Sequence, residues 1–266
     1  MTDPSPTPSP PPARDPLGGS PEGYRVRLAR SSTDIRAAQH LRFQVFNLEL
    51  KEGLRASFDT GLDADPFDAI CDHLLVEDIA SGEIVGTYRL QTGMRAAVGR
   101  GYYSAQEFDL TPFEGLRPTL LELGRACILE GHRSFSVLSL LWRGIARYAA
   151  ANGSRYLIGC SSLALTDPGH AMAAYRALEG HLAEPGLRTQ PLAAFAAQEP
   201  AAASTPKIPR LLHAYLALGA RICGPPALDR EFGTIDFLTI LDMATLSDRT
   251  RSRWGLNEAI DSSDDL

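Results

Sequence analysis

The sequence predicts one α/β domain built on a twisted, mixed β-sheet flanked by helices, and three features support this prediction. Segments with strand-like alternation interleave with amphipathic segments of helical spacing. An amphipathic helix at 134–152 joins two apolar strands at 119–130 and 155–163, the order of a βαβ unit with parallel strands. Residues 72–92 contain two strands joined by a Ser-Gly turn, which predicts an antiparallel hairpin.

The remaining elements follow in order along the chain. Residues 24–30 alternate like a half-buried strand. Residues 31–50 begin with Ser and Thr capping residues and continue with apolar positions at helical spacing, so they predict a helix. A further helix is expected at 167–181, after an Asp-Pro pair. A helix near 208–219 and a strand near 234–243 complete the prediction.

The domain organisation follows from composition. Residues 1–22 are rich in Pro and Ser and lack the apolar segment of a signal peptide, which predicts a disordered tail. The folded domain is expected over 23–245, interrupted by an irregular Pro- and Ala-rich insertion at 182–207. The polar residues 246–266 are expected to fray as a C-terminal tail.

Composition narrows the class of protein. The 266 residues, 44% of them hydrophobic, can bury one sizeable core. A net charge of −6 argues against a general nucleic-acid binder, which needs a basic face to neutralise phosphates. The four cysteines are far apart, so they predict buried reduced thiols and neither a zinc site nor disulfides. The chain has no apolar run long enough for a membrane span, so a soluble or at most peripheral protein is expected.

Two charged residues interrupt the apolar strand at 119–130. Glu122 and Arg125 are three positions apart, so a regular strand would point them to opposite faces. A β-bulge at Gly124 would turn both side chains toward one cleft and would free a backbone N–H to stabilise an oxyanion. A structural ion pair is the alternative, and the segment alone does not decide between the two.

Other charges are placed unusually for a core. Arg42 lies among apolar residues of the first helix, Arg89 follows the hairpin strand, and Asp72 with His73 opens it. Each alone is typical of a surface charge, but together they predict a cleft lined by alternating charge. An acidic run lacks the spacing of a calcium-binding loop, so no metal is expected there; it predicts either ammonium recognition or a solvated loop. Its members are Asp59, Asp63, Asp65, Asp68 and Asp72.

Eight stretches occur in an order that resembles one family. They are "LRFQVFNLEL", "DAICDHLLVED", "GEIVGTYRLQT", "GYYSAQEFDL", "LLELGRACILEGHR", "LLWRGIARYA", "YLIGCSSL" and "LGARICGPPALDREFGTIDFLTILDM". Together they are similar to the ornithine-lipid-synthesising N-acyltransferases, the hemolysin-like, GNAT-related L-ornithine N(alpha)-acyltransferase family. The resemblance covers about residues 24 to 245 and implies a GNAT-like (acyl-CoA N-acyltransferase) fold.

The resemblance also implies a reaction. Members of this family transfer a 3-hydroxyacyl chain from acyl carrier protein (ACP) to the α-amino group of L-ornithine, which gives lyso-ornithine lipid. This is the first step in the biosynthesis of ornithine lipid, a phosphorus-free membrane lipid. The family implies no permanently bound cofactor, an acyl-ACP thioester as co-substrate, and a cytoplasmic location with room for peripheral contact with the inner membrane.

A more distant resemblance to acyl-homoserine-lactone synthases points to particular residues. Arg42 and Phe46 on the first helix, Arg89, and the Glu122–Arg125 pair match that pattern. Aminolysis of a thioester needs a neutral amine, so a general base must remove a proton. Glu122 is the first candidate. His73 is the second, although Asp72 beside it on a strand would point the other way.

The two substrates suggest further roles. Arg89 or Arg125 is expected to hold the ornithine carboxylate, and Asp68 or Asp72 the δ-ammonium. The stretch "HRSFSVLSLLW" lacks the R-x-x-G-x-G/A glycines with which GNAT enzymes bind the CoA pyrophosphate, so a phosphopantetheine arm is the better fit. Because ACP is acidic, a basic docking face is expected, or else an ordinary solvated face. Its residues would be Arg133, Arg143 and Arg147.

Three alternatives remain open. The same fold and thioester chemistry would serve an N-acyl amino acid synthase or an acyl-homoserine-lactone synthase with another amine acceptor. A lytic membrane-binding hemolysin is the non-enzymatic alternative, but the chain has no strongly basic amphipathic segment to support it.

Overall fold

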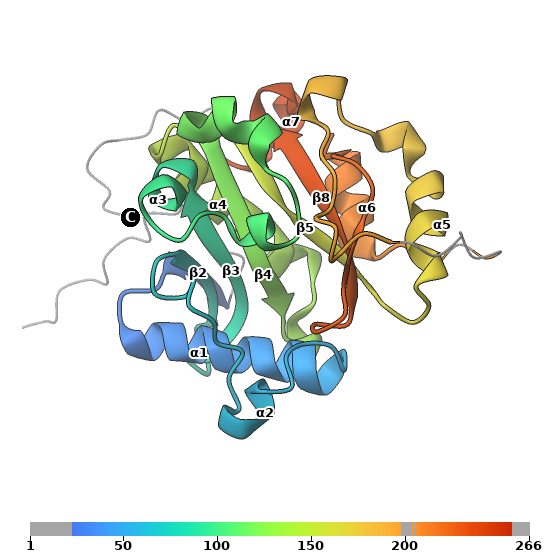
Figure 1. The fold of residues 1–266 in the computed structure, drawn as a ribbon. Coiled ribbons are helices and arrows are strands. Elements are labelled where there is room, and N and C mark those ends of the chain that lie inside the picture. The colour runs from blue at the N-terminus through green and yellow to red at the C-terminus, as the bar shows by residue number, and fades with distance from the viewer. Residues whose placement is uncertain (1–22, 198–203, 205, 257–266) are drawn as a thin grey trace, which may run out of the picture.

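A computed structural model describes residues 23–197, 204 and 206–256. The tail predicted at 1–22 and the end of the chain after residue 256 lie outside the described residues. The described chain forms one eight-stranded sheet with helices around it, as predicted (Figure 1). Within that part of the chain no helix is long and apolar enough to cross a membrane.

The sheet has the order β1-β2-β3-β4-β5-β8-β6, and β7 pairs with β8. Neighbouring strands of the sheet are antiparallel, with the exception of β4 and β5. These two strands are parallel, which confirms the predicted βαβ unit. The hairpin of β2 and β3 is also confirmed. The strands are β1 (Tyr24–Leu28), β2 (Asp72–Asp78), β3 (Ile84–Thr92), β4 (Leu120–Ile128), β5 (Tyr156–Ala164), β6 (Arg221–Ile222), β7 (Ala227–Asp229) and β8 (Thr234–Asp242).

The helices begin at capping residues that the sequence supplies. Ser31 accepts a hydrogen bond from the N–H of Asp34 before α1, and Ser134 accepts one from Val137 before α4. The single helix expected at 31–50 continues after α1 as a π-helix over Phe43–Glu49. The α-helices are α1 (Ser32–Arg42), α2 (Ser57–Thr60), α3 (Gly93–Val98), α4 (Phe135–Ala151), α5 (Gly169–Ala177), α6 (Arg210–Ala217) and α7 (Asp248–Arg253).

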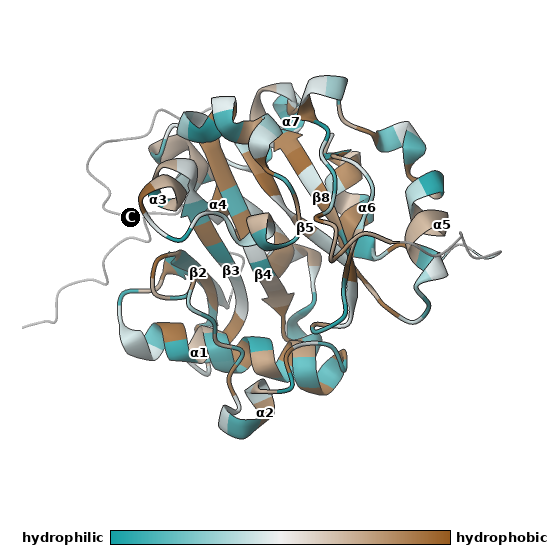
Figure 2. Ribbon diagram, viewed as in Figure 1, coloured by the Kyte–Doolittle hydropathy of each residue, from teal (hydrophilic) through white to brown (hydrophobic). Residues whose placement is uncertain are grey.

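Hydrophobic packing places the two long helices on opposite faces of the sheet. The apolar stripe of α4 packs on β1 to β4, and α1 packs on β3 and β4. Figure 2 shows hydrophobic residues concentrated on the strands, while α1 alternates hydrophobic and hydrophilic positions. The α1 face of the sheet therefore has room for polar side chains that the α4 face excludes.

A β-bulge interrupts the pairing of β3 with β4. Thr87 lies opposite Cys127, but Arg89, two residues later, lies opposite Gly124, so β4 contains one extra residue. The predicted bulge is therefore present, yet Gly124 is not the residue that bends. Arg125 adopts the left-handed conformation, with a φ of 51°.

The bulge changes which residues of β4 face α4. Glu122, before the extra residue, and Arg125, at it, both face away from α4 and line one cavity, as the predicted bulge requires. The side chains on the α4 side occupy odd positions before the bulge and even positions after it: Leu121, Leu123, Ala126 and Ile128.

The C-terminal segment corrects the predicted tail at 246–266. Leu246 is buried, α7 follows it, and Trp254 is only 3% exposed. The Trp254 ring stacks on Trp142 of α4 with 5.0 Å between the ring centroids. Because the Trp254 ring is buried against α4, the ordered domain extends at least to that residue. The polar composition of the segment gave no sign of this contact.

Strands β4 and β5 pair over only three residues and then separate. Their last paired residues are Glu122 and Ile158. The next residue of β5, Gly159, lies against the Leu123 carbonyl, and a Cβ at this position would come within 2.2 Å of that oxygen. A glycine is therefore required where the strands part.

We expect Gly159→Ala to destabilise the protein by about 1–3 kcal/mol, because backbone atoms must move to admit the methyl group. Gly115→Ala is the matched control, since a Cβ there meets nothing within 4 Å. Urea unfolding of both variants tests this, and equal midpoints for the two would contradict the close approach.

Candidate active site

A cavity of about 230 Å³ opens beside the bulge. It is lined by Glu122 and Arg125, which face away from α4, and also reaches Leu123 and Ala126 on the α4 side of β4. Its walls come from β3, β4, β5 and β8, the π-helix, the segment before β4 and the region of α6. The charged residues that line it are Arg89, Arg125, Glu52, Glu107, Glu122, Asp229 and Asp236. Five carboxylates therefore meet two guanidinium groups in one small volume.

Glu122 is held in this cavity by the segment that precedes β4. Its side chain accepts hydrogen bonds from the N–H of Tyr103 at 2.8 Å and from the N–H and Oγ of Ser104 at 2.8 and 2.7 Å. A carboxylate offers about four lone-pair sites. Three are occupied here, and the fourth, on Oε2, remains for a substrate or a water molecule.

The protonation of Glu122 suits a general base. The residue is only 4% exposed, and burial raises its pKa above the ordinary value although the hydrogen bonds from Ser104 and Tyr103 oppose the shift. A base with a raised pKa holds a transferred proton more firmly than an exposed carboxylate does. Glu122 thus has a fixed orientation, an open lone pair and a suitable basicity.

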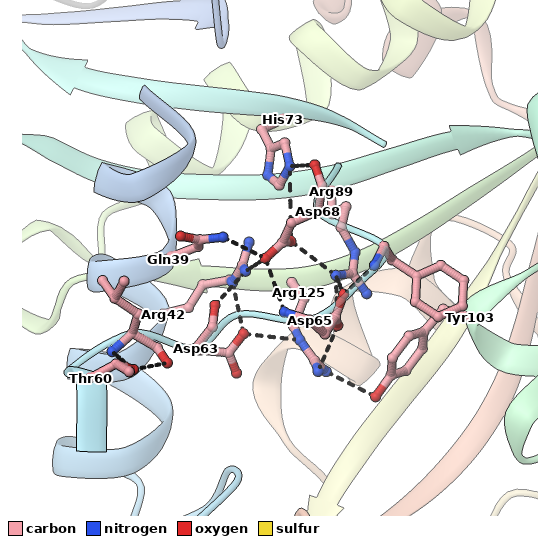
Figure 3. Close-up of polar contacts among 12 residues, drawn as sticks. Gln39, Arg42, Thr60, Asp63, Asp65, Asp68, His73, Arg89, Tyr103 and Arg125 are labelled. Atoms are coloured by element: carbon pink, nitrogen blue, oxygen red, sulfur yellow. Dashed lines mark hydrogen bonds and ion pairs between the residues drawn. The ribbon is translucent and has the colours of Figure 1, made fainter. Parts of the chain in front are cut away.

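Arg125 is fixed by aspartates rather than by Glu122. Its Nη2 lies 3.2 Å from Asp65 and its Nε 3.2 Å from Asp63, while Nη1 donates to the Tyr103 hydroxyl at 3.2 Å (Figure 3). Among the ion pairs of the described residues, none joins Arg125 to Glu122. The two residues share the cavity wall but do not neutralise each other.

Arg89 brings a hydrogen-bond donor without a partner to the same wall. Its Nη1 donates to Asp65 at 2.7 and 2.8 Å and to Asp68 at 3.1 Å. Its Nη2 is buried and has no hydrogen-bond partner in the described structure. A buried unpaired donor is unfavourable, so this atom is suited to an anionic group that enters the cavity.

Arg42 belongs to the same network but lies away from the cavity. Its side chain is 0% exposed and donates to Asp63 at 2.9 Å and to Asp68 at 2.7 Å. Burial alone would raise the pKa of Asp68, but Arg42 and Arg89 hold it well below the ordinary value. The structure brings Arg42 and Asp68 together as a buried pair, and neither lines the cavity.

The second candidate base, His73, and the other residues predicted to bind the substrate do not lie together. His73 is buried, and its Nε2 lies 3.1 Å from the carbonyl oxygen of Asp68, which can only accept a hydrogen bond. Burial lowers the pKa of His73, which favours the neutral form of the ring. Asp72 binds Arg95 and the Tyr148 hydroxyl outside the cavity, so it does not pair with His73. Phe46 lines the cavity and packs edge-on against Phe232.

The three arginines predicted for the carrier lie on or before α4. Arg133 is exposed just before the helix and pairs with Glu49. Arg143 and Arg147 are half-buried along α4. None of the three lines the cavity.

Sequence reasoning missed the acidic side of the cavity. Glu52, Glu107, Asp229 and Asp236 come from four separate segments, so no local pattern joins them. Asp236 carried a signal, because it interrupts the apolar strand "TIDFLTILD" as Glu122 interrupts β4. The carboxylates of Glu107, Asp229 and Asp236 lie within 4.8 Å of one another, close enough to hold a cation.

A second, smaller cavity of about 70 Å³ lies where β4 and β5 separate. It shares the bulge residues Gly124, Arg125 and Ala126 with the first cavity. Its other walls are mainly apolar and aromatic: Tyr88, Leu123, Trp142, Leu157, Tyr215 and Leu241. A cavity lined by many charged residues and a second one whose only charged residue in the described lining is Arg125 thus meet at the bulge.

We expect Asp68→Asn to destabilise the protein by about 3–5 kcal/mol at neutral pH, because it leaves buried Arg42 and Arg89 partly unpaired. Asp59→Asn, in the same acidic run but exposed, should stay within about 0.5 kcal/mol of the wild type.

Chemical unfolding across pH provides the second test. The pKa of Asp68 is depressed in the folded state, so its contribution is present above the unfolded pKa and is lost on acidification. The difference between wild type and Asp68→Asn should therefore shrink as the pH falls from about 5 toward 2. A difference that stays constant would contradict this account.

Comparison with known proteins identifies the family. The model of the "Acetyltransferase (GNAT) domain" matches residues 41–143. The chain is 36% identical over 250 residues to the L-ornithine N(alpha)-acyltransferase of Rhodobacter capsulatus, which covers 88% of this chain and 96% of that protein. It is 37% identical over 249 residues to the protein of that name from Brucella abortus, with 86% and 88% covered.

Solved structures support the fold. An N-acyl amino acid synthase from uncultured soil microbes, FeeM, superimposes with a TM-score of 0.50 at 15% identity, covering 86% of this chain and 94% of that one. A CoA-dependent acyl-homoserine lactone synthase, BjaI, gives 0.50 at 12% identity, with 88% and 90% covered. The predicted GNAT-type fold is confirmed. The chain is an acyltransferase and belongs to the L-ornithine N(alpha)-acyltransferase family.

Proposed function

We propose that the protein transfers a 3-hydroxyacyl chain from acyl-ACP to the α-amino group of L-ornithine and so forms lyso-ornithine lipid, the first step of ornithine lipid biosynthesis. The relatives named for ornithine acylation support the acceptor. The observation that carries the proposal is the open lone pair of Glu122 in a cavity shared with Arg89 and Arg125.

Glu122 acts as the general base in the proposed reaction. The α-ammonium of a free amino acid is mostly protonated at neutral pH. Oε2 of Glu122 takes one proton, directly or through a water molecule, and the neutral amine attacks the thioester carbonyl. The carbon–sulfur bond of the tetrahedral intermediate then breaks, an amide forms, and the thiol leaves with a proton. The irregular backbone at Arg125 lies beside this point and is the candidate donor to the oxyanion.

Arg89 is the favoured partner for the substrate carboxylate. Its unpaired Nη2 is buried in the cavity wall, and a carboxylate there would satisfy it with a charge-assisted hydrogen bond. Arg125 lies on the same wall and adds positive charge. Asp68 and Asp72, expected to bind the ammonium group, do not line the cavity. Asp68 already pairs with Arg42 and Arg89, and Asp72 with Arg95, so a different acidic group is needed for that role.

The donor approaches from the side where β4 and β5 separate. The aromatic and aliphatic walls of the second cavity suit the thioester end of an acyl chain. Exposed Arg133, just before α4, would exchange its partner Glu49 for the phosphate of a phosphopantetheine arm or for acidic residues of ACP. Arg143 and Arg147 on α4 extend the proposed docking face.

A lipid product must leave the enzyme for a membrane, and we propose peripheral contact for this step. Leu48 and Leu50 at the end of the π-helix and Phe58 on α2 are large exposed apolar residues. Leu50 also lines the main cavity. Exposed apolar side chains that include one cavity-lining residue suit release of an acylated product into a bilayer surface.

We expect Glu122→Gln to lower kcat by about 100- to 10,000-fold, because the amide cannot accept the proton. Ser104→Ala removes one hydrogen bond to Glu122 but keeps the carboxylate, so it should cost far less activity. Steady-state rates and thermal unfolding of both variants are the measurement. Normal turnover by Glu122→Gln would show that another group is the base.

Mass spectrometry of the products identifies the substrates. Purified protein offered acyl-ACP or acyl-CoA with a panel of amino acids should form acyl-ornithine from acyl-ACP at the highest rate. Arg133→Glu should raise the KM for acyl-ACP about tenfold and leave the KM for ornithine unchanged. Faster acylation of another amino acid would contradict ornithine as the acceptor. Equal use of acyl-ACP and acyl-CoA would contradict acyl-ACP as the donor.

A further inference from the structure

Three carboxylates lie together at the side of the main cavity formed by β7, β8 and the segment before β4. Glu107 follows the short helical segment that binds Glu122, Asp229 ends β7, and Asp236 lies in β8. Their oxygens are within 4.8 Å of one another, and all three residues line the cavity. Such close carboxylates repel one another unless a proton or a cation lies between them.

The neighbours of these carboxylates neutralise little of their charge. Asp236 accepts hydrogen bonds from the hydroxyls of Ser162 and Thr234. Asp229 accepts two from backbone N–H groups of the turn that follows it, at 2.9 and 2.8 Å. The two arginines of the cavity, Arg89 and Arg125, form their ion pairs with Asp63, Asp65 and Asp68 instead.

Glu107 has a buried carboxylate oxygen that lacks a hydrogen-bond partner in the described structure. Its side chain is only 3% exposed, and the oxygen without a partner is Oε2. An acceptor left in this state is unfavourable unless a ligand or a shared proton satisfies it. Glu107 is one of the residues that line the cavity, so a ligand that enters the cavity lies beside this carboxylate.

The protonation behaviour agrees with a shortage of positive charge. Burial, followed by repulsion from Asp236 and Asp229 and by a side-chain hydrogen bond with Asp236, raises the pKa of Glu107 to about 9. Burial also raises the pKa of Asp236 to about 6 and, with Asp236 nearby, that of Glu52 to about 7. Arg125 opposes the shift at Glu107 but does not cancel it.

We infer that Glu107, Asp229 and Asp236 form the subsite for the side-chain ammonium of the acceptor amino acid and select ornithine over amino acids with neutral side chains. This inference rests on the proposed function. An ammonium group has three N–H donors, which three convergent carboxylates can accept. Arg89 would then hold the carboxylate and Glu122 the α-amine, so each polar group of ornithine has its own partner.

The test compares ornithine with norvaline, which has the same carbon chain without the δ-amine. Wild-type kcat/KM should favour ornithine by at least about 1,000-fold, because norvaline would leave the carboxylates unpaired. Glu107→Gln and Asp236→Asn should each lower kcat/KM for ornithine about 100-fold and leave that for norvaline within about threefold. Exposed Glu114→Gln is the control and should behave like the wild type.

Several outcomes would overturn the inference. Equal losses for ornithine and norvaline in both variants would indicate a structural role, and a wild type without preference would exclude a selective subsite. Ornithine binding that disappears in EDTA and returns with Mg²⁺ would assign the carboxylates to a metal ion.

Calorimetric binding to the wild type separates this inference from the proposed reaction. An enzyme that acylates neither amino acid, yet binds ornithine more tightly than norvaline, would contradict the reaction and support the subsite. Equally tight binding of ornithine and norvaline would contradict the subsite. This test uses only the wild type, so it does not depend on whether the variants fold.

Discussion

The site depends on one extra residue in β4. That residue shifts the pairing with β3 so that Glu122 and Arg125, three positions apart, face the same cavity. Arg125 takes a left-handed conformation at a cost of about 1–3 kcal/mol, and its ion pairs with Asp63 and Asp65 hold it there. The same irregularity lies beside the point where β4 leaves β5. One local distortion thus joins the cavity lined by charged residues to the smaller second cavity.

Charge is distributed unequally around this bulge. On the α1 side, three arginines and three aspartates compensate one another in a buried network, which leaves Arg89 Nη2 as an open donor. On the β8 side, carboxylates lack such partners, and burial raises the pKa of Glu107 to about 9. While no cation is bound, these buried carboxylates destabilise the folded protein. A substrate with an anionic end and a cationic end would pair with Arg89 on one wall and with the carboxylates on the other.

Much of the fold could be predicted from local pattern. The β2–β3 hairpin, the parallel β4 and β5, and α4 with its Ser134 cap follow from alternation, spacing and capping. The bulge was predictable because two charges interrupted an apolar strand. The conformation of Arg125 and the acidic wall were not, because both depend on contacts between distant segments. Trp254 was missed because one aromatic residue inside a polar segment gives no periodic signal.

A crystal structure with N-acyl-ornithine bound would test the central claim most directly. The account predicts the amide nitrogen beside Oε2 of Glu122 and the carboxylate on Arg89. The acyl chain should pass the bulge toward the opening between β4 and β5. A regular β4 ladder with Glu122 directed to solvent, or a product bound away from the bulge, would contradict it.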